Sequence, residues 1–336
     1  MKVLVTGSAG FIGAAVAGAL VRRGDEVLGI DDFNPYYNPL MKHARIAPLK
    51  QSPLYNHVSI DIADSVSVES IFAGFEPDVV VHLAAQAGVR HALTDPYSYG
   101  RSNLIGFLNI LESSKNRTQH LLYASSSSVY GLNQSLPFVE SDPVFRPTSL
   151  YAATKIANEA MAHAYSSNFD LRTTGMRFFT VYGPWGRPDM MPIKFARSIL
   201  ADQPIELFNS GNHSRDFTYI DDVVDGVLSI IDGGSSLGVP DVVKADDEQG
   251  ALPYSIFNIG GENPVHLLEF VDLLEHQLGK AAVKVFVPRQ LGDMSETHAS
   301  NEKLRNITGW NPRISIEEGV RRFAEWALCN VEYLQP

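Results

Sequence analysis

The glycine-rich stretch GSAGFIG, at residues 7–13, restricts the fold of this chain more than any other part of the sequence. The apolar residues 2–6 before it are typical of a short buried strand, and residues 11–23 after it have the pattern of a helix that ends before Gly24. Because glycine has no Cβ, glycines at a three-residue spacing permit the tight turn that joins a strand directly to a helix. The sequence therefore predicts a strand-turn-helix unit at its start.

Strand-like and helix-like segments alternate through the first half of the chain. Strands that alternate with helices form a parallel sheet covered by helices on both faces. The fold class that we expect is therefore α/β, with a Rossmann-type doubly wound parallel sheet. After the first strand, further strands are expected at residues 26–31, 57–60, 78–83, 120–124 and 171–177.

The pattern changes after about Thr180, where proline and glycine become more frequent and the loops become longer. We expect a Rossmann domain over residues 1–180 and a smaller C-terminal α/β substrate lobe over residues 181–336, with chain crossings between the two. Residues 233–252 lack periodicity and are rich in small and acidic residues, which predicts a surface loop. Helices are expected in the lobe at residues 193–201, 220–231, 265–278 and 316–332.

Composition argues against several classes of protein. The chain has 336 residues, 45% of them apolar, which is enough for a large core. A formal net charge of −11 argues against nucleic acid or an anionic membrane as the main partner. The single cysteine, Cys329, permits no intrachain disulfide, so we predict a cytoplasmic protein. No apolar run approaches the ~20 residues that span a bilayer, and the histidines lack metal-ligand spacing, so we expect no membrane anchor and no metal.

The glycine turn and the strand after it form a pattern that is typical of a dinucleotide site. Free N–H groups at the start of a helix, together with the helix dipole, favour a bound pyrophosphate. Asp31 ends the next strand about twenty residues on, where a carboxylate can bond the adenosine ribose. This carboxylate would repel the 2′-phosphate of NADP, and Asp32 follows it, so NAD is the expected cofactor. The alternative is a solvated strand end; residues 61–62 are either an adenine contact or an ordinary loop.

Tyr151 and Lys155 are four residues apart, which places them on one face of a helix that we expect to start near Pro147. A free phenol titrates near ~10, and a cation at ~4 Å in a medium of effective dielectric ~20 contributes roughly 4 kcal/mol. We therefore predict that Lys155 lowers the pKa of Tyr151 toward neutrality, so that the phenolate can take a hydroxyl proton as hydride leaves. Ser126 lies 25 residues earlier, at the end of an apolar strand, where α/β sheets bind ligands. An exposed pair on a helix surface is the alternative.

Together these motifs resemble the extended short-chain dehydrogenase/reductase family over essentially the whole chain. GSAGFIG is similar to the family's GxxGxxG, residues 82–85 (HLAA) are similar to its HxAA strand, and Asn103 and the YxxxK pair fall in order. The resemblance implies that Ser126 bonds the reacting hydroxyl, that Tyr151 is the acid/base, and that Lys155 binds the nicotinamide ribose. With the glycine turn, it predicts the cofactor-binding residues Gly7, Gly10, Phe11, Ile12, Gly13, Asp31, Asp32, Asn34, Asp61, Ile62, Leu83, Ala84, Ala85, Asn103, Tyr151 and Lys155.

Longer phrases, at residues 31–37, 84–90, 149–155 and 177–190, are similar to those of UDP-glucuronate 4-epimerases within that family. This resemblance implies interconversion of UDP-glucuronate and UDP-galacturonate through a 4-keto intermediate, with transient reduction of NAD. It also implies a UDP-sugar as the bound partner and a homodimer, often formed through the helix that carries the tyrosine. UDP-glucose 4-epimerase, UDP-glucuronate decarboxylase and a non-catalytic NAD-sensing protein stay as alternatives.

The 4-ketone of UDP-glucuronate is a β-keto acid that loses carbon dioxide easily, so an epimerase must anchor the carboxylate. The resemblance assigns this anchor to Ser127, Ser128 and Thr180, with Arg187 as a candidate to support them. Related decarboxylases have glutamate at position 128, and related dehydratases have an Asp-Glu pair at 127–128. The two serines therefore argue against both reactions, because no carboxyl group there can move the extra proton. The alternative for the serine run is a strand-to-loop turn with capping hydroxyls.

The nucleotide end of the substrate is expected in the second half of the chain. Lys194 and Phe208 are assigned near uracil, and Arg215 and Asp293 near the diphosphate and ribose. Arg215 is the firmest of these, since a diphosphate needs a charged or forked donor. Lys194 could equally be a solvated helix lysine. Arg90 is either a ligand contact or a loop residue beside the cofactor.

Overall fold

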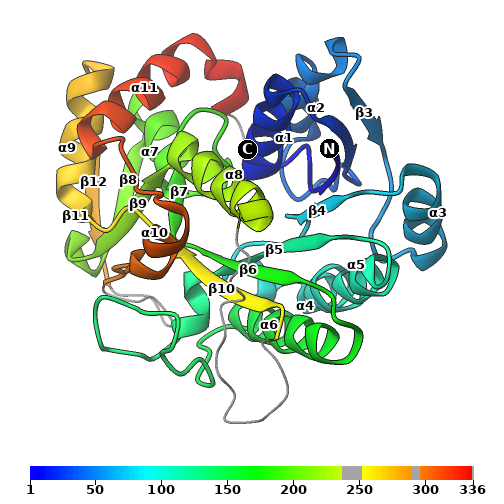
Figure 1. The fold of residues 1–336 in the computed structure, drawn as a ribbon. Helices are drawn as coiled ribbons and strands as arrows, with labels where there is room; N and C mark the ends of the chain where they lie inside the picture. Colours follow the sequence, from blue (N-terminus) through cyan, green and yellow to red (C-terminus); the bar gives the residue numbers. More distant parts are fainter. Residues whose placement is uncertain (237–251, 289–295, 335–336) are drawn as a thin grey trace.

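A seven-stranded sheet forms the centre of the computed structural model, which describes residues 1–236, 252–288 and 296–334 (Figure 1). The strand order is β10-β6-β5-β4-β1-β2-β3, and every neighbouring pair is parallel. The order reverses between β1 and β4, which is the position where doubly wound sheets bind ligands. The predicted fold class is confirmed. The strands are β1 (Lys2–Thr6), β2 (Glu26–Ile30), β3 (Tyr55–Val58), β4 (Val79–His82), β5 (His120–Ser126), β6 (Thr173–Phe178) and β10 (Tyr254–Ile259).

Helices cover both faces of this sheet. Val3 and Val5 pack into a core with α1 and α8, whereas Leu4 between them packs into a second core with α3, α5 and α6. Alternate side chains of a strand point to opposite faces, so both faces of β1 are buried. The helices of this layer are α1 (Phe11–Arg23), α2 (Pro39–Ile46), α3 (Ser65–Phe75), α4 (Pro96–Tyr99), the π-helix η3 (Gly100–Gly106), α5 (Phe107–Ser114), α6 (Leu150–Phe169) and α8 (Ile220–Ser236).

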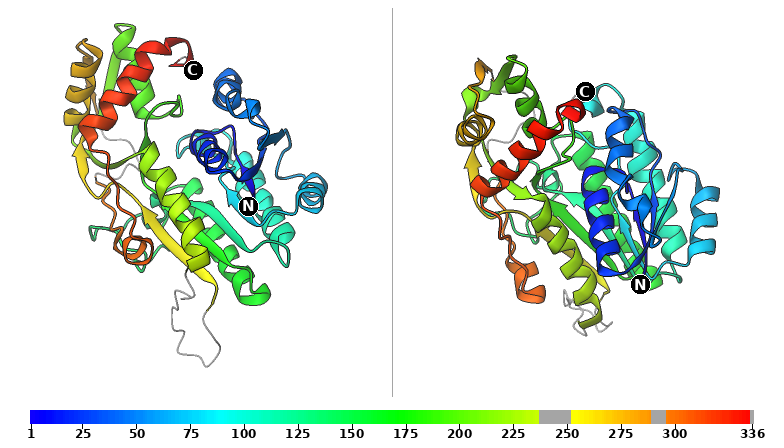
Figure 2. Two further views of the ribbon diagram at one scale, coloured as in Figure 1. Left: turned by 45° about the horizontal axis from the view of Figure 1, so that its top comes forward. Right: turned by 90° about the horizontal axis from the view of Figure 1, so that it is seen from above.

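Most of the remaining residues form a smaller α/β layer beside the sheet, in which α9 and α11 lie side by side (Figure 2). Its strands form two small sheets, with the orders β11-β9-β7 and β12-β8. Its elements are β7 (Thr180–Tyr182), α7 (Met191–Leu200), β8 (Pro204–Phe208), β9 (Ser214–Tyr219), β11 (Pro264–His266), α9 (Leu267–Leu278), β12 (Val283–Val287), α10 (Glu302–Thr308) and α11 (Ile316–Cys329). Short 3-10 turns occur at η1 (Leu49–Gln51), η2 (His91–Leu93), η4 (Ser127–Tyr130), η5 (Asn209–Gly211) and η6 (Val331–Leu334).

Two segments from beyond residue 180 return to the central sheet. Strand β10 pairs with β6 as its seventh strand, and α8 packs against α1. The division of the chain at residue 180 stays a prediction.

Several expected boundaries were wrong at the ends of helices. Residues 233–236 were expected in a loop but continue α8 to Ser236, and the rest of that loop, residues 237–251, lies outside the described residues. The helix expected to start near Pro147 starts at Leu150, because the Ser149 hydroxyl caps it by accepting the Ala152 N–H at 3.1 Å. Residues 265–266 belong to β11, and α11 ends at Cys329.

Candidate active site

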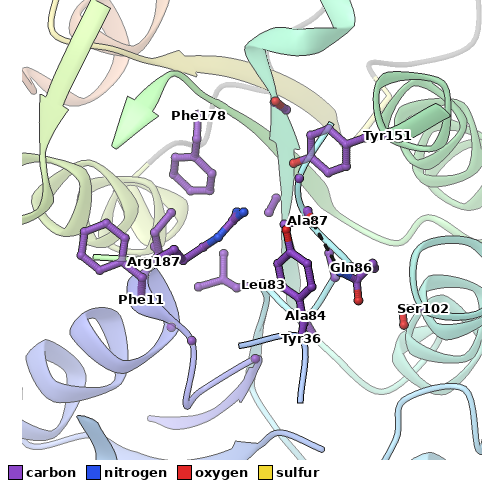
Figure 3. A pocket seen from close by; sticks show the side chains of 18 of the residues that line it. Phe11, Tyr36, Leu83, Ala84, Gln86, Ala87, Ser102, Tyr151, Phe178 and Arg187 are labelled. Carbon is purple, nitrogen blue, oxygen red and sulfur yellow. Dashed lines mark hydrogen bonds between the residues drawn. The ribbon is translucent and has the colours of Figure 1, made fainter. Parts of the chain in front are cut away.

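A pocket opens at the carboxyl ends of β1, β4 and β5 and brings most of the predicted site residues together (Figure 3). It is lined by the glycine turn, by the loops after β2 and β4, by the end of β5 and by the start of α6. The predicted residues that line it are Gly7, Gly10, Phe11, Ile12, Gly13, Asp31, Asp32, Asn34, Asp61, Ile62, Leu83, Ala84, Ala85, Ser126, Ser127, Ser128, Tyr151, Lys155, Thr180 and Arg187.

The glycine turn is packed too closely for larger residues. Gly7 has φ +68°, and a Cβ there would lie 2.7 Å from the backbone nitrogen of Ala84. A Cβ on Gly13 would lie 2.1 Å from the carbonyl oxygen of Gly7, far inside van der Waals contact. Gly10 is the N-cap of α1 and has no side chain to cap the helix, and this uncapped start of α1 lines the pocket. This geometry fits the binding of a pyrophosphate.

Asp31 is buried at the end of β2 and accepts hydrogen bonds from several donors. The backbone N–H groups of Ala9 and Phe33 donate to it at 3.2 and 2.9 Å. Lys42, on α2, donates to it from Nζ at 3.3 Å and also lines the pocket. The sequence argument missed Lys42, because its position depends on how α2 packs. The charge of the Asp31 carboxylate is therefore partly balanced by a lysine.

Tyr151 and Lys155 lie on one face of α6, as their spacing predicts, with the Lys155 Nζ 5.9 Å from the centroid of the Tyr151 ring. Nζ donates to the carbonyl oxygen of Ala124 at 2.8 Å. Burial lowers the pKa of Lys155 to about 8, against an opposing effect of Glu159. The ammonium of the unliganded protein is thus held at the end of β5.

The pKa of Tyr151 is raised, so the expectation that Lys155 brings it toward neutrality is wrong for the chain without ligand. Burial of the phenol raises this pKa, and the charge of Arg187 and a hydrogen bond with Ser126 lower it by less. The cation that favours the phenolate is therefore Arg187. Desolvation outweighs it because the ring is enclosed.

The serine run both lines the pocket and forms a turn. The Ser126 hydroxyl accepts the N–H of Ser128 at 3.2 Å and lies 3.2 Å from the Ser128 hydroxyl, so it caps η4. Behind it, Ser125 donates at 2.6 Å to Glu159, which pairs with Arg177 at 2.8 Å. The segment is thus a capped turn that lines the pocket, and the role of its hydroxyls as a carboxylate anchor stays a prediction.

Arg187 forms a two-point ion pair that the sequence analysis did not foresee. Its Nε and Nη2 donate to the two carboxylate oxygens of Asp189 at 3.0 and 2.5 Å. The Tyr36 hydroxyl donates to the same carboxylate at 3.0 Å. Tyr36 and Asp189 lie within phrases 31–37 and 177–190, but nothing in those phrases indicates that they meet.

Four predicted residues do not line this pocket: Asn103, Lys194, Phe208 and Arg215. Asn103 is buried, and its side-chain amide bonds the backbone N–H and C=O of Gln86 at 2.8 and 3.0 Å and the Thr154 hydroxyl at 3.0 Å. It therefore connects the loop after β4 to α6.

The residues assigned to the nucleotide lie in the smaller layer. Lys194 is on α7, Phe208 ends β8, and Arg215 is on β9. The guanidinium of Arg90 lies 4.9 Å over the Phe208 ring, which connects the loop after β4 to that layer. Asp293 lies outside the described residues.

Residues 1–236, 252–288 and 296–334 contain no cluster of three or more His, Cys, Asp or Glu side chains suited to a metal ion. Within the same ranges, each helix is too short or too polar to traverse a lipid bilayer.

Comparison with known proteins identifies the family. Residues 3–245 match the NAD dependent epimerase/dehydratase family. Protein CapI of Staphylococcus aureus is 46% identical over 332 residues, covering 98% of each chain, and a probable UDP-glucuronate 4-epimerase of Rhizobium meliloti (strain 1021) is 43% identical, covering 97% of this chain and 96% of the relative.

A solved structure extends the match to three dimensions. The UDP-glucuronic acid 4-epimerase of Bacillus cereus, in complex with UDP-glucuronic acid and NAD, is similar with a TM-score of 0.87 and 30% identity, over 98% of this chain and 99% of that one. Because the match covers both layers, the likeness is not limited to the Rossmann sheet. The chain therefore belongs to the NAD dependent epimerase/dehydratase family, and it is an NAD-dependent enzyme.

Proposed function

We propose that this enzyme is a UDP-glucuronate 4-epimerase, which interconverts UDP-glucuronate and UDP-galacturonate through a 4-keto intermediate. The observation that carries the proposal is one shared pocket. Tyr151, the serine turn, Thr180 and Arg187 line the same pocket as the glycine turn. Relatives of nearly equal length that are named for this reaction support the choice of sugar.

In this proposal Tyr151 is the acid/base and Ser126 orients the reacting hydroxyl. The glycine turn and Asp31 would hold NAD, which would supply a reversible hydride acceptor for C4 of the sugar and a positive charge near the phenol. Arg187 and the Ser126 hydrogen bond already favour the phenolate, against burial. Tyr151 would then take the C4 hydroxyl proton and return it after the sugar has turned. Lys155 would leave Ala124 to bond the nicotinamide ribose.

The carboxylate of the sugar would be held by neutral hydroxyl donors and by Arg187. Ser127, Ser128 and Thr180 all line the pocket, which supports this assignment. Neither serine position carries a carboxyl group, so the extra proton transfer of a decarboxylase or dehydratase has no donor there. For the nucleotide, we propose contacts with Lys194, Phe208, Arg215 and Asp293.

We also propose a homodimer. Apolar side chains are exposed on neighbouring helices of one layer: Leu150 at the start of α6, Ile105 on η3 and Leu108 on α5. Since η3 and α5 both contact α6, a second copy can bury these residues together. Light scattering on the purified protein tests this, and a monomeric mass would contradict it.

Incubation of the purified protein with UDP-glucuronate, followed by NMR of the product, tests the reaction. We expect UDP-galacturonate at equilibrium with substrate and no accumulation of NADH. A UDP-pentose with carbon dioxide would identify a decarboxylase instead. Faster turnover of UDP-glucose would identify a UDP-glucose 4-epimerase, and no turnover of either would favour a non-catalytic NAD-sensing protein.

A further inference from the structure

The ion pair with Asp189 uses only part of the Arg187 guanidinium. Nε and Nη2 are taken by the Asp189 carboxylate at 3.0 and 2.5 Å, so the pair leaves the Nη1 end as the part that can reach another ligand. Figure 3 shows the Arg187 side chain pointing into the pocket, as does the Tyr151 ring. Asp189 itself does not line the pocket. The Asp189 carboxylate thus contacts the Nε and Nη2 side of the guanidinium without itself lining the pocket.

Asp189 is fixed by a contact from another segment. The Tyr36 hydroxyl donates to it at 3.0 Å from the loop that follows β2. Gly88, with φ +100°, makes room for this contact, since a Cβ there would lie 2.7 Å from the Tyr36 hydroxyl oxygen. Burial raises the pKa of Asp189, but the charge and hydrogen bonds of Arg187 outweigh it and hold the pKa below its ordinary value. Asp189 is therefore an anion at neutral pH.

The backbone that carries Arg187 is also fixed. Arg45, 6% exposed, donates to the carbonyl oxygen of Trp185 at 2.8 and 3.0 Å and to that of Gly186 at 3.1 Å. It also donates to the carbonyl oxygen of Ala9, at 3.1 Å, within the glycine turn. The loop before Arg187 is thus attached to the glycine turn, so the backbone that carries Arg187 cannot move far without breaking these bonds.

The geometry points to Asp189, held by Tyr36, as the positioning residue that orients Arg187 and offsets part of its charge, and so sets how strongly the pocket prefers carboxylated over neutral UDP-hexoses. The inference rests on the proposed function, because it concerns the sugar carboxylate. An unpaired guanidinium would hold a carboxylate in a strong ion pair. A paired one offers hydrogen bonds with less net charge, which anchors the carboxylate while the sugar turns between hydride removal and return.

The test compares the affinities of UDP-glucuronate and UDP-glucose for the NAD-loaded enzyme, by calorimetry, in the wild type and in Asp189→Asn. The amide keeps the size of the side chain and removes its charge. We expect UDP-glucuronate to bind about tenfold tighter and UDP-glucose to change less than about twofold, since only the former carries a charge that the exposed cation attracts. We also expect a lower kcat for UDP-glucuronate, because a tighter ground state slows the turn of the sugar.

Two control variants separate charge from shape. Asp189→Glu keeps the charge and shifts its position, so the ratio of the two affinities should stay within about twofold of wild type. In an Arg187→Gln background, Asp189→Asn should no longer favour UDP-glucuronate, because the cation that it unmasks is gone. If Asp189→Asn does not fold, Asp189→Ser is the neutral replacement.

The inference would be overturned if Asp189→Asn changed the affinity for both UDP-sugars equally. It would also be overturned if Asp189→Asn still favoured UDP-glucuronate in the Arg187→Gln background. A different result would contradict the proposed function. If wild-type enzyme binds UDP-glucuronate without converting it, the reaction is wrong, while the ratio of affinities still measures the effect of Asp189.

Discussion

The two ends of the pocket are constructed differently. At the cofactor end the lining is mainly backbone, a glycine turn in which a Cβ on Gly13 would lie 2.1 Å from a carbonyl oxygen. At the sugar end the lining is side chains that come from distant segments, such as Ser127, Thr180 and Arg187. A local turn is specified by a few neighbouring residues, whereas an assembled site depends on how whole elements pack.

This difference predicts how each end responds to change. A substitution in the turn deforms the backbone, so we expect it to affect folding and cofactor binding together. A substitution at the sugar end removes one contact and leaves the backbone unchanged, so we expect it to change the rate of turnover or the identity of the product.

Tyr151→Phe should reduce kcat for UDP-glucuronate by about 10²–10⁴-fold, because it removes the only proposed acid/base and keeps the ring. Binding of NAD and of the nucleotide sugar should stay within about threefold of wild type, since a sugar-end change leaves the scaffold. Steady-state kinetics and calorimetry measure the two effects. An undiminished rate would assign the proton transfer to another group.

Gly13→Ala should destabilise the protein by about 1–3 kcal/mol and weaken NAD binding at the same time, because the new Cβ would meet the Gly7 carbonyl. Gly74→Ala, in α3, is the matched control, since a Cβ there meets nothing within 4 Å. That control should be neutral or stabilising by up to about 1 kcal/mol. Urea unfolding measures both, and equal stabilities of the two variants would contradict the contrast between the ends of the pocket.

The same contrast explains what the sequence could predict. Periodicity and glycine spacing predict β1, α1 and β2 within a residue, because these elements depend on neighbouring residues. The strands β7, β8, β9, β10, β11 and β12 were not predicted, since no local motif marks them and the partners of most of them are distant in the sequence.

At the site, motif spacing predicts that Tyr151 and Lys155 share a face of a helix, which the structure confirms. The partners Lys42 and Asp189 were missed, because nothing local indicates which carboxylate or cation each will meet. The pKa of Tyr151 was predicted in the wrong direction, because burial of the ring depends on the complete fold.

Lys155 lies where the two ends meet, and its titration sharpens the comparison. Burial lowers its pKa in the folded chain to about 8, so between about pH 8 and its unfolded value of ~10.4 the unfolded chain binds more protons. The free energy of unfolding therefore rises with pH in that window, by a few kcal/mol at ~1.4 kcal/mol per pKa unit. Urea unfolding of the NAD-free wild type and of Lys155→Met at several pH values measures this contribution. It is the difference in the free energy of unfolding between the two proteins. If the difference in unfolding free energy between the two proteins stayed constant from pH 8 to 10, burial would not lower the pKa of Lys155.

The smallest effect is expected for single hydroxyls of the proposed carboxylate anchor. Ser127→Ala or Thr180→Val removes one neutral donor and leaves Arg187 with Asp189, so turnover of UDP-glucuronate should fall by less than about tenfold, the value of one hydrogen bond. With the carboxylate less constrained, the 4-keto intermediate should lose carbon dioxide more often, and NMR should detect a UDP-pentose that the wild type does not release. Ser135→Ala, on a loop outside the pocket, is the control and should leave rate and product unchanged. Slower epimerisation with no pentose from either variant would mean that Arg187 and the remaining hydroxyls hold the carboxylate without them.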